Sequence, residues 1–313
     1  MITEQLPYTD YGRIIRKRLG GRVQKLSIDA SMSCPNRDGR IAHGGCTFCL
    51  NEAFSPAYCR EAKSITEQIE QGIKFHTARH RHGDRYLAYF QSGSNTYNSI
   101  GNLERLYNEA LSHPAISGII IGTRPDCISS EILDLLEYFS TRNFVCVEYG
   151  IESTKEETLK HINRGHSYAQ AQQAVALTRE RGIECGAHLI LGLPNESREE
   201  IIAHATQLNT LDLQSIKLHQ LQIYRNTPMA KEWTEHPERF LFANTISTEE
   251  YASLIIEFLR HLKSSIAIER MASVAPRHLL LHSPLRGVRP DRLRELIIKQ
   301  MLTMGATQGD LIR

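Results

Sequence analysis

Along the first 240 residues or so, short apolar runs alternate with longer stretches whose apolar positions recur at helical spacing. The apolar runs predict six strands, at residues 25–30, 86–91, 117–123, 144–150, 185–192 and 215–224. The clearest helical stretches are residues 64–80, 130–140 and 167–182, and the last of them ends in a glycine, a frequent helix terminator. Such alternation predicts a parallel sheet whose strands are joined by right-handed crossovers.

The pattern changes after about residue 240. Residues 247–262 and 290–302 read as amphipathic helices on either side of one short apolar piece, SIAIERM, at residues 265–271. No long linker separates this tail from the preceding residues, so we expect it to pack on the sheet. In a parallel barrel the working residues lie at the carboxyl ends of the strands and on the loops that follow, and the candidate chemistry is expected there.

Composition sets broad limits. The chain has 313 residues, 41% of them hydrophobic, which is enough for a sizeable core. Thirty-seven basic and 35 acidic residues give a formal charge of +2, which neither demands nor excludes an anionic partner. The N-terminal segment lacks the apolar core of a signal peptide, and no apolar run approaches the roughly 18 residues that span a bilayer. We therefore expect a cytoplasmic protein without membrane association.

Three of the seven cysteines lie on one loop after the first predicted strand, in CPNRDGRIAHGGCTFC at residues 34–49. An odd cysteine count without a signal peptide argues against a disulfide framework and favours metal binding or catalysis. Structural zinc normally takes four ligands, whereas an iron-sulfur cluster held by Cys34, Cys46 and Cys49 would keep one iron open. Cys59 is a candidate fourth ligand, so a zinc-stabilised binding module without turnover stays open as an alternative.

Two pairs of polar residues fall on predicted strands. Glu148 and Glu152 are four positions apart and share one side of an extended strand, where buried carboxylates without partners would be costly. Lys217 and His219 alternate with apolar residues, so both should point the same way. If they point into the barrel, they suit acid-base work or anion binding.

A third group follows the third predicted strand, in GTRPDC at residues 122–127. Arg124 and Asp126 either bind substrate or pair with each other. Cys127 is a candidate hydrogen donor, with burial as a small apolar side chain the commoner role of a free cysteine.

Taken together with the cysteine loop, four further motifs resemble the radical S-adenosylmethionine (SAM) superfamily. They are GTRPDC at residues 122–127, VEYGIES at 147–153, INRGH at 162–166 and HLILGLP at 188–194. More narrowly, they resemble the YhcC/YtqA-like family, whose members are related to the radical domain of the elongator catalytic subunit. The resemblance implies an α/β fold, a partial (βα)6 TIM-like barrel. It divides the chain into an N-terminal segment (1–17), a core domain (18–260) and a C-terminal helical extension (261–313) packed on the core.

The resemblance also implies a single 4Fe-4S cluster ligated by the three clustered cysteines, with SAM bound to the open iron. Reductive cleavage of SAM would then give methionine and a 5'-deoxyadenosyl radical that removes hydrogen from a substrate. The implied SAM contacts are Phe48 at the cluster or adenine, Ser92 and Gly93 near the SAM ammonium, Glu148 or Glu152 at the ribose or amino group, Arg164 at the carboxylate, and Ile190 at the adenine. Without the resemblance, Arg164 would read as a surface residue.

Relatives implied by the resemblance act on tRNA, at the side chain on carbon 5 of the wobble uridine. Two basic clusters, at residues 13–25 and 277–294, fit such a partner, although a solvated helix face explains them equally well. The expected reaction converts a carboxymethylaminomethyl group to aminomethyl, with electrons from a donor such as flavodoxin or ferredoxin. Radical SAM chemistry on a small metabolite or a protein stays open as an alternative.

Overall fold

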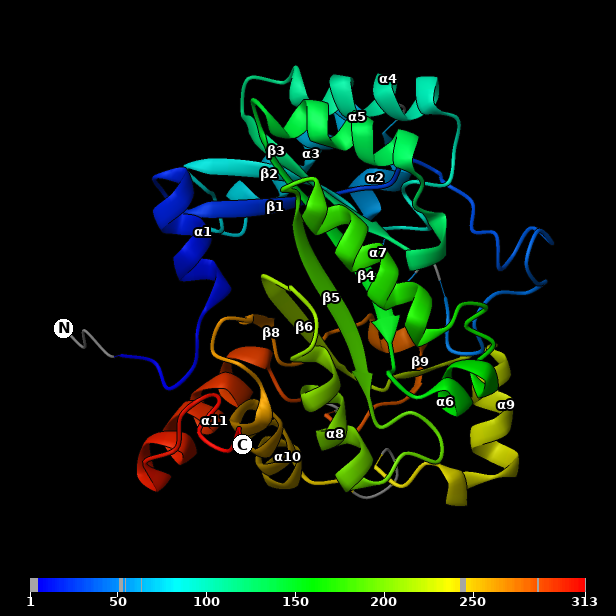
Figure 1. Cartoon of the computed structure of the whole chain (residues 1–313), viewed down its shortest axis with the longest axis vertical. Coiled ribbons are helices and arrows are strands. Elements are labelled where there is room, and N and C mark those ends of the chain that lie inside the picture. The colour runs from blue at the N-terminus through cyan, green and yellow to red at the C-terminus, as the bar shows by residue number, and fades with distance from the viewer. Residues whose placement is uncertain are drawn as a thin grey trace.

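Seven parallel strands form one curved sheet in the order β1-β2-β3-β4-β5-β6-β8 (Figure 1). The computed structural model describes residues 5–50, 53, 55–62, 64–242, 246–285 and 287–312. The strands of the sheet are β1 (Val23–Ile28), β2 (Arg85–Phe90), β3 (Ile116–Thr123), β4 (Phe144–Glu152), β5 (Glu184–Leu191), β6 (Ser215–Gln220) and β8 (Ala267–Arg270). The sheet curls into a half-barrel, with β1 and β8 as its two edges.

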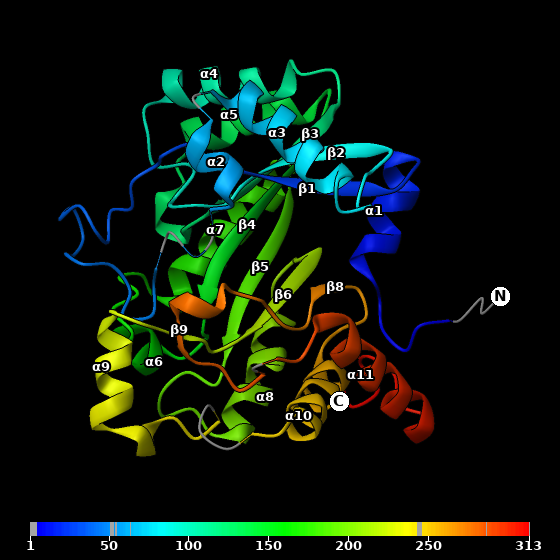
Figure 2. The ribbon, with the colours of Figure 1, turned by 180° about the vertical axis from the view of Figure 1, so that it is seen from behind.

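Helices connect the strands, and several of them cover the outer face of the sheet. They are α1 (Tyr11–Leu19), α2 (Ala57–Glu61), α3 (Ile65–Thr77), α4 (Ile100–Leu111), α5 (Ser130–Ser140), α6 (Glu156–His161), α7 (Tyr168–Glu180), α8 (Arg198–Leu208), α9 (Pro228–Glu235), α10 (Thr248–His261) and α11 (Pro290–Met304). Figure 1 shows α7 in front of β4, and Figure 2, from behind, shows β4 in front of α7. None of the helices in the described ranges is long and apolar enough to cross a membrane.

Short-range signals in the sequence explain several helix boundaries. Ser64, Ser167, Ser197 and Ser247 each begin a helix with a capping box, in which the serine side chain and a Glu or Gln three residues later bond each other's backbone N–H. A short antiparallel ribbon of β7 (Ile223–Tyr224) and β9 (Leu280–His282) lies outside the main sheet. Single turns of 3-10 helix occur at Pro125–Cys127, Pro237–Arg239 and Arg277–Leu279.

The predicted fold class, a partial TIM-like α/β barrel with C-terminal helices, is confirmed, with one strand more than the six predicted. The added strand, β8, lies within SIAIERM. The apolar pattern alone did not distinguish this strand from a loop that connects two helices. It is four residues long and ends in two charged residues, too short for a clear alternation. The last predicted strand divides into β6 and β7. The domain boundaries after residues 17 and 260 stay a prediction. Strand β8 of the main sheet lies beyond the second boundary, within the segment that was expected to be a helical extension.

Helix α1 closes the end of the half-barrel at which the strands begin. Asp10 caps its first turn by accepting a bond from the N–H of Arg13. Tyr11 and Ile15 are buried in a cluster with residues of the strands, which are Leu87, Tyr89, Ile120, Phe144, Cys146 and Ala267. In Figure 1 this helix lies beside the starts of β1 and β2, and the loop that follows β1 lies at the opposite end. One end of the barrel is therefore filled, and the other is left for a site.

Alanine substitutions at two glycines would test how tightly the sheet is packed. A Cβ at Gly118 on β3 would lie 2.2 Å from the backbone oxygen of Phe144, whereas a Cβ at Gly101 on α4 would meet nothing within 4 Å. We expect Gly118→Ala to lower the free energy of unfolding by about 1–3 kcal/mol or more, because β3 and β4 must separate. Gly101→Ala should raise it by about 0.5–1 kcal/mol. Urea unfolding monitored by circular dichroism measures both, and equal stability of the two variants would contradict this packing.

Candidate active site

A cavity of about 230 Å³ opens at the carboxyl ends of the strands. Its walls come from the loop after β1 and from side chains on β2 to β6 and β8 that face the barrel interior. On β4, for example, the interior positions are Phe144, Cys146, Glu148, Gly150 and Glu152, and the last three line the cavity. The site therefore lies where a parallel barrel would carry its chemistry.

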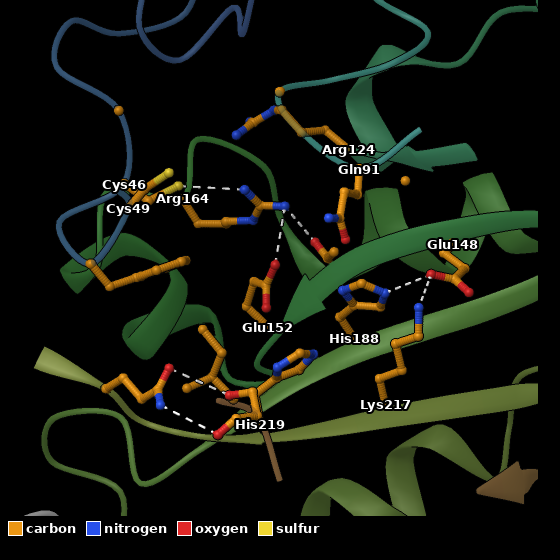
Figure 3. A pocket seen from close by; sticks show the side chains of 18 of the residues that line it. Cys46, Cys49, Gln91, Arg124, Glu148, Glu152, Arg164, His188, Lys217 and His219 are labelled. Carbon is orange, nitrogen blue, oxygen red and sulfur yellow. Dashed lines mark hydrogen bonds and ion pairs between the residues drawn. The ribbon is translucent and has the colours of Figure 1, made fainter. Parts of the chain in front are cut away.

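The three clustered cysteines line this cavity. Figure 3 labels two of them, Cys46 and Cys49, on one side of it. Cys46 is buried, and Cys34 and Cys49 are partly buried. Burial, with the nearby Cys46 sulfur, raises the pKa of the Cys49 thiol, and the Arg37 and Arg164 guanidinium groups oppose this shift. Nη2 of Arg37 also donates to the carbonyl of Cys49 at 3.0 Å. Positive charge thus stands beside sulfurs that would have to lose protons to bind a metal.

Arg164 connects the cysteine side of the cavity to β4 (Figure 3). Its Nη1 lies 3.4 Å from the sulfur of Cys46, its Nη2 donates to the carbonyl of Gly150 at 2.6 Å, and Oε1 of Glu152 lies 3.7 Å away. Burial lowers the pKa of Arg164, but Cys46 and Glu152 outweigh it and raise the pKa above its ordinary value. A Cβ at Gly150 would lie 2.7 Å from Nη2, so this approach depends on glycine.

A layer of buried charges forms the floor of the cavity. Lys217 Nζ lies 2.5 Å from Oε2 of Glu148 and 3.2 Å from Oε1 of Glu269. Lys25 Nζ lies 3.2 Å from Oε1 of Glu148 and 2.6 Å from Oε2 of Glu269. Burial alone would raise the pKa of Glu148, but the two lysines and His188 hold it well below its usual range. Since Lys25 is on β1 and Glu269 on β8, this layer joins the two edge strands, which share no ladder of hydrogen bonds.

Polar rings complete the floor. The hydroxyl of Tyr89 accepts from Lys217 Nζ at 3.0 Å, and Nε2 of His188 lies 2.9 Å from Oε2 of Glu148. His219 packs beside His188, with ring centroids 5.3 Å apart, and its Nε2 is buried without a hydrogen-bond partner among the described residues. Burial and the neighbouring His188 lower the pKa of His219 well below the ordinary histidine value, so its ring is neutral at pH 7.

Most of the residues selected from the sequence line this one cavity. Besides the cysteines, they are Phe48, Gly93, Arg124, Glu148, Glu152, Arg164, Ile190, Lys217 and His219. Lys217 and His219 both point inward (Figure 3). Gly93 has φ of +77°, and a Cβ there would lie 2.3 Å from the carbonyl oxygen of Met32, so the segment after β2 packs against the cysteine loop through a glycine.

Three selected residues lie elsewhere. Ser92 is buried, its Oγ 2.6 Å from that of Ser55, and it does not line the cavity. Asp126 accepts two hydrogen bonds of 2.8 Å from Arg124. Of the two alternatives for these residues, substrate binding or pairing with each other, the structure therefore contains the pairing. Asp126 and Cys127 face a second cavity, and burial raises the pKa of the Cys127 thiol to about 12.

The remaining cysteines are also apart from the site. Cys59, the candidate fourth ligand, lies on α2 and donates to the carbonyl of Ser27 at 3.1 Å. Burial, and secondarily Asp29, raises the pKa of the Cys59 thiol to about 12. Cys146 and Cys185 are buried in β4 and β5. The position of Cys59 therefore does not support a zinc site formed by this residue and the three clustered cysteines.

Sequence reasoning missed several residues of the site. Tyr89 and Glu269 were not singled out, Lys25 was counted only with a basic cluster, and His188 was named only as part of the motif HLILGLP. Arg37, Arg270 and Ser273, which also line the cavity, were missed as well. A usable signal existed for Lys25 and Tyr89, which hold interior positions of strands that were otherwise correctly predicted. None existed for Glu269 and Arg270, because β8 itself was not recognised.

Comparison with known proteins places this arrangement in a family. Residues 37–208 match the radical SAM superfamily, and residues 213–303 match the Radical_SAM C-terminal domain. The chain therefore belongs to the radical SAM superfamily. YhcC of Escherichia coli K12 is 36% identical over 273 residues, which cover 87% of this chain and 85% of that protein. YtqA of Bacillus subtilis 168 is 30% identical, over 94% and 89%. Within the superfamily this is a YhcC-like protein.

More distant matches extend the comparison. Human Elongator complex protein 3 is 25% identical over 224 residues, which cover 70% of this chain and only 38% of that protein. Among solved structures, archaeal Methanocaldococcus infernus Elp3 with an N-terminal deletion superimposes with a TM-score of 0.64 at 17% identity. That superposition covers 91% of this chain and 64% of the other. At this identity the likeness shows a common fold and nothing finer.

The charged floor can be tested by a double-mutant cycle at pH 7. We expect Lys217→Met to cost about 3–5 kcal/mol of unfolding free energy, because it leaves Glu148 buried with less positive charge around it. Combining it with Glu148→Gln should cost less than the sum of the single changes. The exposed pair Arg292→Met and Glu295→Gln on α11, as a control, should change stability by less than about 1 kcal/mol. Additive effects at 148 and 217 would contradict the pairing.

The same charged floor predicts how the free energy of unfolding changes with pH. The pKa of Glu148 is lower in the folded than in the unfolded chain, so its ion pairs stabilise the fold above the ordinary value of 4.5 and are lost as pH falls through the lower, folded value. Glu148→Gln removes this contribution, and its unfolding free energy should therefore fall less on acidification than that of the native chain. Parallel slopes of the two chains against pH would contradict this.

Proposed function

We propose that Cys34, Cys46 and Cys49 ligate a 4Fe-4S cluster and that Arg164 binds the carboxylate of SAM. Membership of the superfamily implies this cluster and SAM as cofactors. The single observation that carries the residue assignment is that three thiols from one loop line the same cavity as Arg164, whose Nε is buried without a hydrogen-bond partner among the described residues. Thiolates suit iron, and an arginine fork suits a carboxylate.

When bound and reduced, these cofactors supply a 5'-deoxyadenosyl radical that removes a hydrogen atom from a substrate. The chain would contribute position and shielding. Glu152 faces Arg164 and is the better placed of the two glutamates to meet the amino group or ribose of SAM, since Glu148 is held in the floor by two lysines. Phe48 and Ile190 supply apolar wall. His219, neutral and with a free Nε2, can hold or move a proton there.

For the substrate we propose tRNA carrying 5-carboxymethylaminomethyluridine at the wobble position. The proposed reaction oxidises the carbon between the amine and the carboxylate, and water then cleaves the carbon–nitrogen bond. Substrate, water and SAM would give the aminomethyl nucleoside, glyoxylate, methionine, 5'-deoxyadenosine and one proton. SAM is the net oxidant, and a donor such as flavodoxin or ferredoxin would supply the initiating electron. The substrate part of the proposal rests on the resemblance to the elongator subunit.

The basic clusters give this substrate only partial support. Lys25 points into the barrel rather than to the surface, and Arg18 pairs with Glu184. In the C-terminal cluster, Arg292 pairs with Glu295 and Arg294 with Asp10, and Arg286 lies outside the described residues. Arg16 and Lys17 on α1 stay exposed. A solvated helix face is therefore the better explanation of the C-terminal cluster.

The cluster assignment predicts a contrast among cysteine variants. After anaerobic reconstitution with iron and sulfide, Cys34→Ala, Cys46→Ala and Cys49→Ala should each lose most cluster iron and the cleavage of SAM to 5'-deoxyadenosine. Cys59→Ala is the matched control, because its thiol bonds the backbone outside the cavity, and it should keep both. Iron and sulfide analysis with chromatography of the nucleoside measures the outcome. Loss of iron in Cys59→Ala would refute three-cysteine ligation.

The substrate assignment predicts a change in cellular tRNA. Deletion of the gene should leave carboxymethylaminomethyl wobble uridines to accumulate at the expense of the aminomethyl form and of anything made from it. Mass spectrometry of digested tRNA measures this, and a plasmid copy with the three cysteines changed to alanine serves as control. An unchanged set of wobble uridines would sink the tRNA assignment and favour a metabolite or protein substrate.

A further inference from the structure

Arg270 reaches the cavity because of an irregularity in β8. The pairing of β6 with β8 is regular from Ser215 to Ile216 but then shifts, so that Lys217 lies opposite Arg270 and Glu269 is the extra residue. With strict alternation, Glu269 and Arg270 would point to opposite faces of the sheet. Instead, Glu269 bonds the floor lysines and Arg270 lines the cavity. Bulges of this kind commonly re-aim a side chain beside an active site.

Arg270 differs from the other arginines of the cavity in having no partner. Arg37 donates to the carbonyl of Cys49, Arg124 to Asp126 and Arg164 to Gly150. In the part of the chain that the structure describes, the side chain of Arg270 has neither an ion pair nor a hydrogen bond, and its backbone belongs to β8. Its side chain is exposed on the same cavity wall as Ser273 and Val274, the latter 72% exposed, which puts it at the mouth of the cavity.

The surrounding charges make Arg270 the unbalanced cation on this side. Lys25 and Lys217 are matched by Glu148 and Glu269 in the floor. His219, the adjacent ring, is neutral, and the positive charge of Arg270 is one of the causes of its lowered pKa. A single negative charge entering from the mouth would therefore find one guanidinium without a partner, whose fork fits a carboxylate.

We infer that Arg270 is the specificity residue that binds the carboxylate of the substrate. This rests on the proposed function, in which the group to be removed ends in a carboxylate. A guanidinium at the mouth would hold the end of that group while its reacting carbon extends toward the cysteine side of the cavity. The aminomethyl product lacks the carboxylate, so it would lose this contact and leave. A phosphate of the RNA backbone is the other anion that could meet Arg270.

A pair of oligonucleotides separates these sources. One is an anticodon stem-loop with 5-carboxymethylaminomethyluridine at the wobble position, and the other carries the neutral amide in place of the carboxylate. The reconstituted native enzyme should bind the acid at least about tenfold more tightly than the amide. Arg270→Gln should weaken binding of the acid roughly 10- to 100-fold and leave the amide unchanged. Arg270→Lys, with the charge but not the fork, should fall between.

The kinetics add a readout that a folding defect would not reproduce. Arg270→Gln should raise KM for the acid with little change in kcat, and cluster iron should equal that of the native chain. Arg292→Gln on α11, whose guanidinium pairs with Glu295 and does not line the cavity, is the matched control and should change nothing.

Each outcome decides the inference. If the native enzyme binds acid and amide equally, or if Arg270→Gln leaves the acid unaffected while conversion proceeds, the carboxylate assignment is wrong and the proposed function stands. If Arg270→Gln weakens both oligonucleotides equally, Arg270 contacts a backbone phosphate, and the assignment is again wrong. If the native enzyme does not convert the acid at all, the proposed substrate fails, and the carboxylate assignment fails with it.

Discussion

The burial of the Glu148 carboxylate inside the half-barrel is the constraint on which the rest of the site depends. A charge removed from water costs several kcal/mol unless opposite charges and hydrogen bonds replace the solvent. Here the replacement comes from Lys217 and Lys25, and Glu269 balances the second lysine. Because these four residues stand on β4, β6, β1 and β8, satisfying the carboxylate also fixes how far the sheet curls. The open side of the barrel is closed by ion pairs where a full barrel would use backbone hydrogen bonds.

This charged layer divides the barrel interior into zones with different physical roles. Below it, α1 and the apolar side chains around Tyr11 and Ile15 exclude water from the end where the strands begin. Above it, the cysteine loop and Arg164 provide a polar, cationic wall, and Phe48 and Ile190 provide apolar surface. Reactive chemistry needs a site that does not deform when a substrate enters. A floor of mutually paired charges is rigid in this way, because each charged side chain is held in place by its partners.

The sequence predicted more of the fold than of the interior. Six strands and the main helices followed from apolar spacing and, for one helix, a terminal glycine, because these signals are local. The cysteine loop, Glu148 and Lys217 were found because their residue types are expensive to bury or chemically distinctive. Arg164 was found only through the family resemblance of the motif that contains it. Glu269 and Arg270 were missed because β8 has only four residues and gains its place from pairing with β6, a contact that no local pattern records. The contact between Ser92 and Ser55 was likewise beyond reach, since it depends on how two loops fold together.

The way in which α1 closes the barrel also sets an order of events for the growing chain. Thr9 accepts a bond from the N–H of Ile268 at 2.8 Å, and Gln308 donates its N–H to the carbonyl of Pro7 at 2.8 Å. Residues close to the start of the described chain are therefore fastened by residues that follow them by 259 (268 − 9) and 301 (308 − 7) positions. Contacts across such sequence separations form late, since a long loop must close before they contribute. Until then the apolar interior below the charged layer is open to water, so this part of the core stays exposed until the segments around Ile268 and Gln308 have been made.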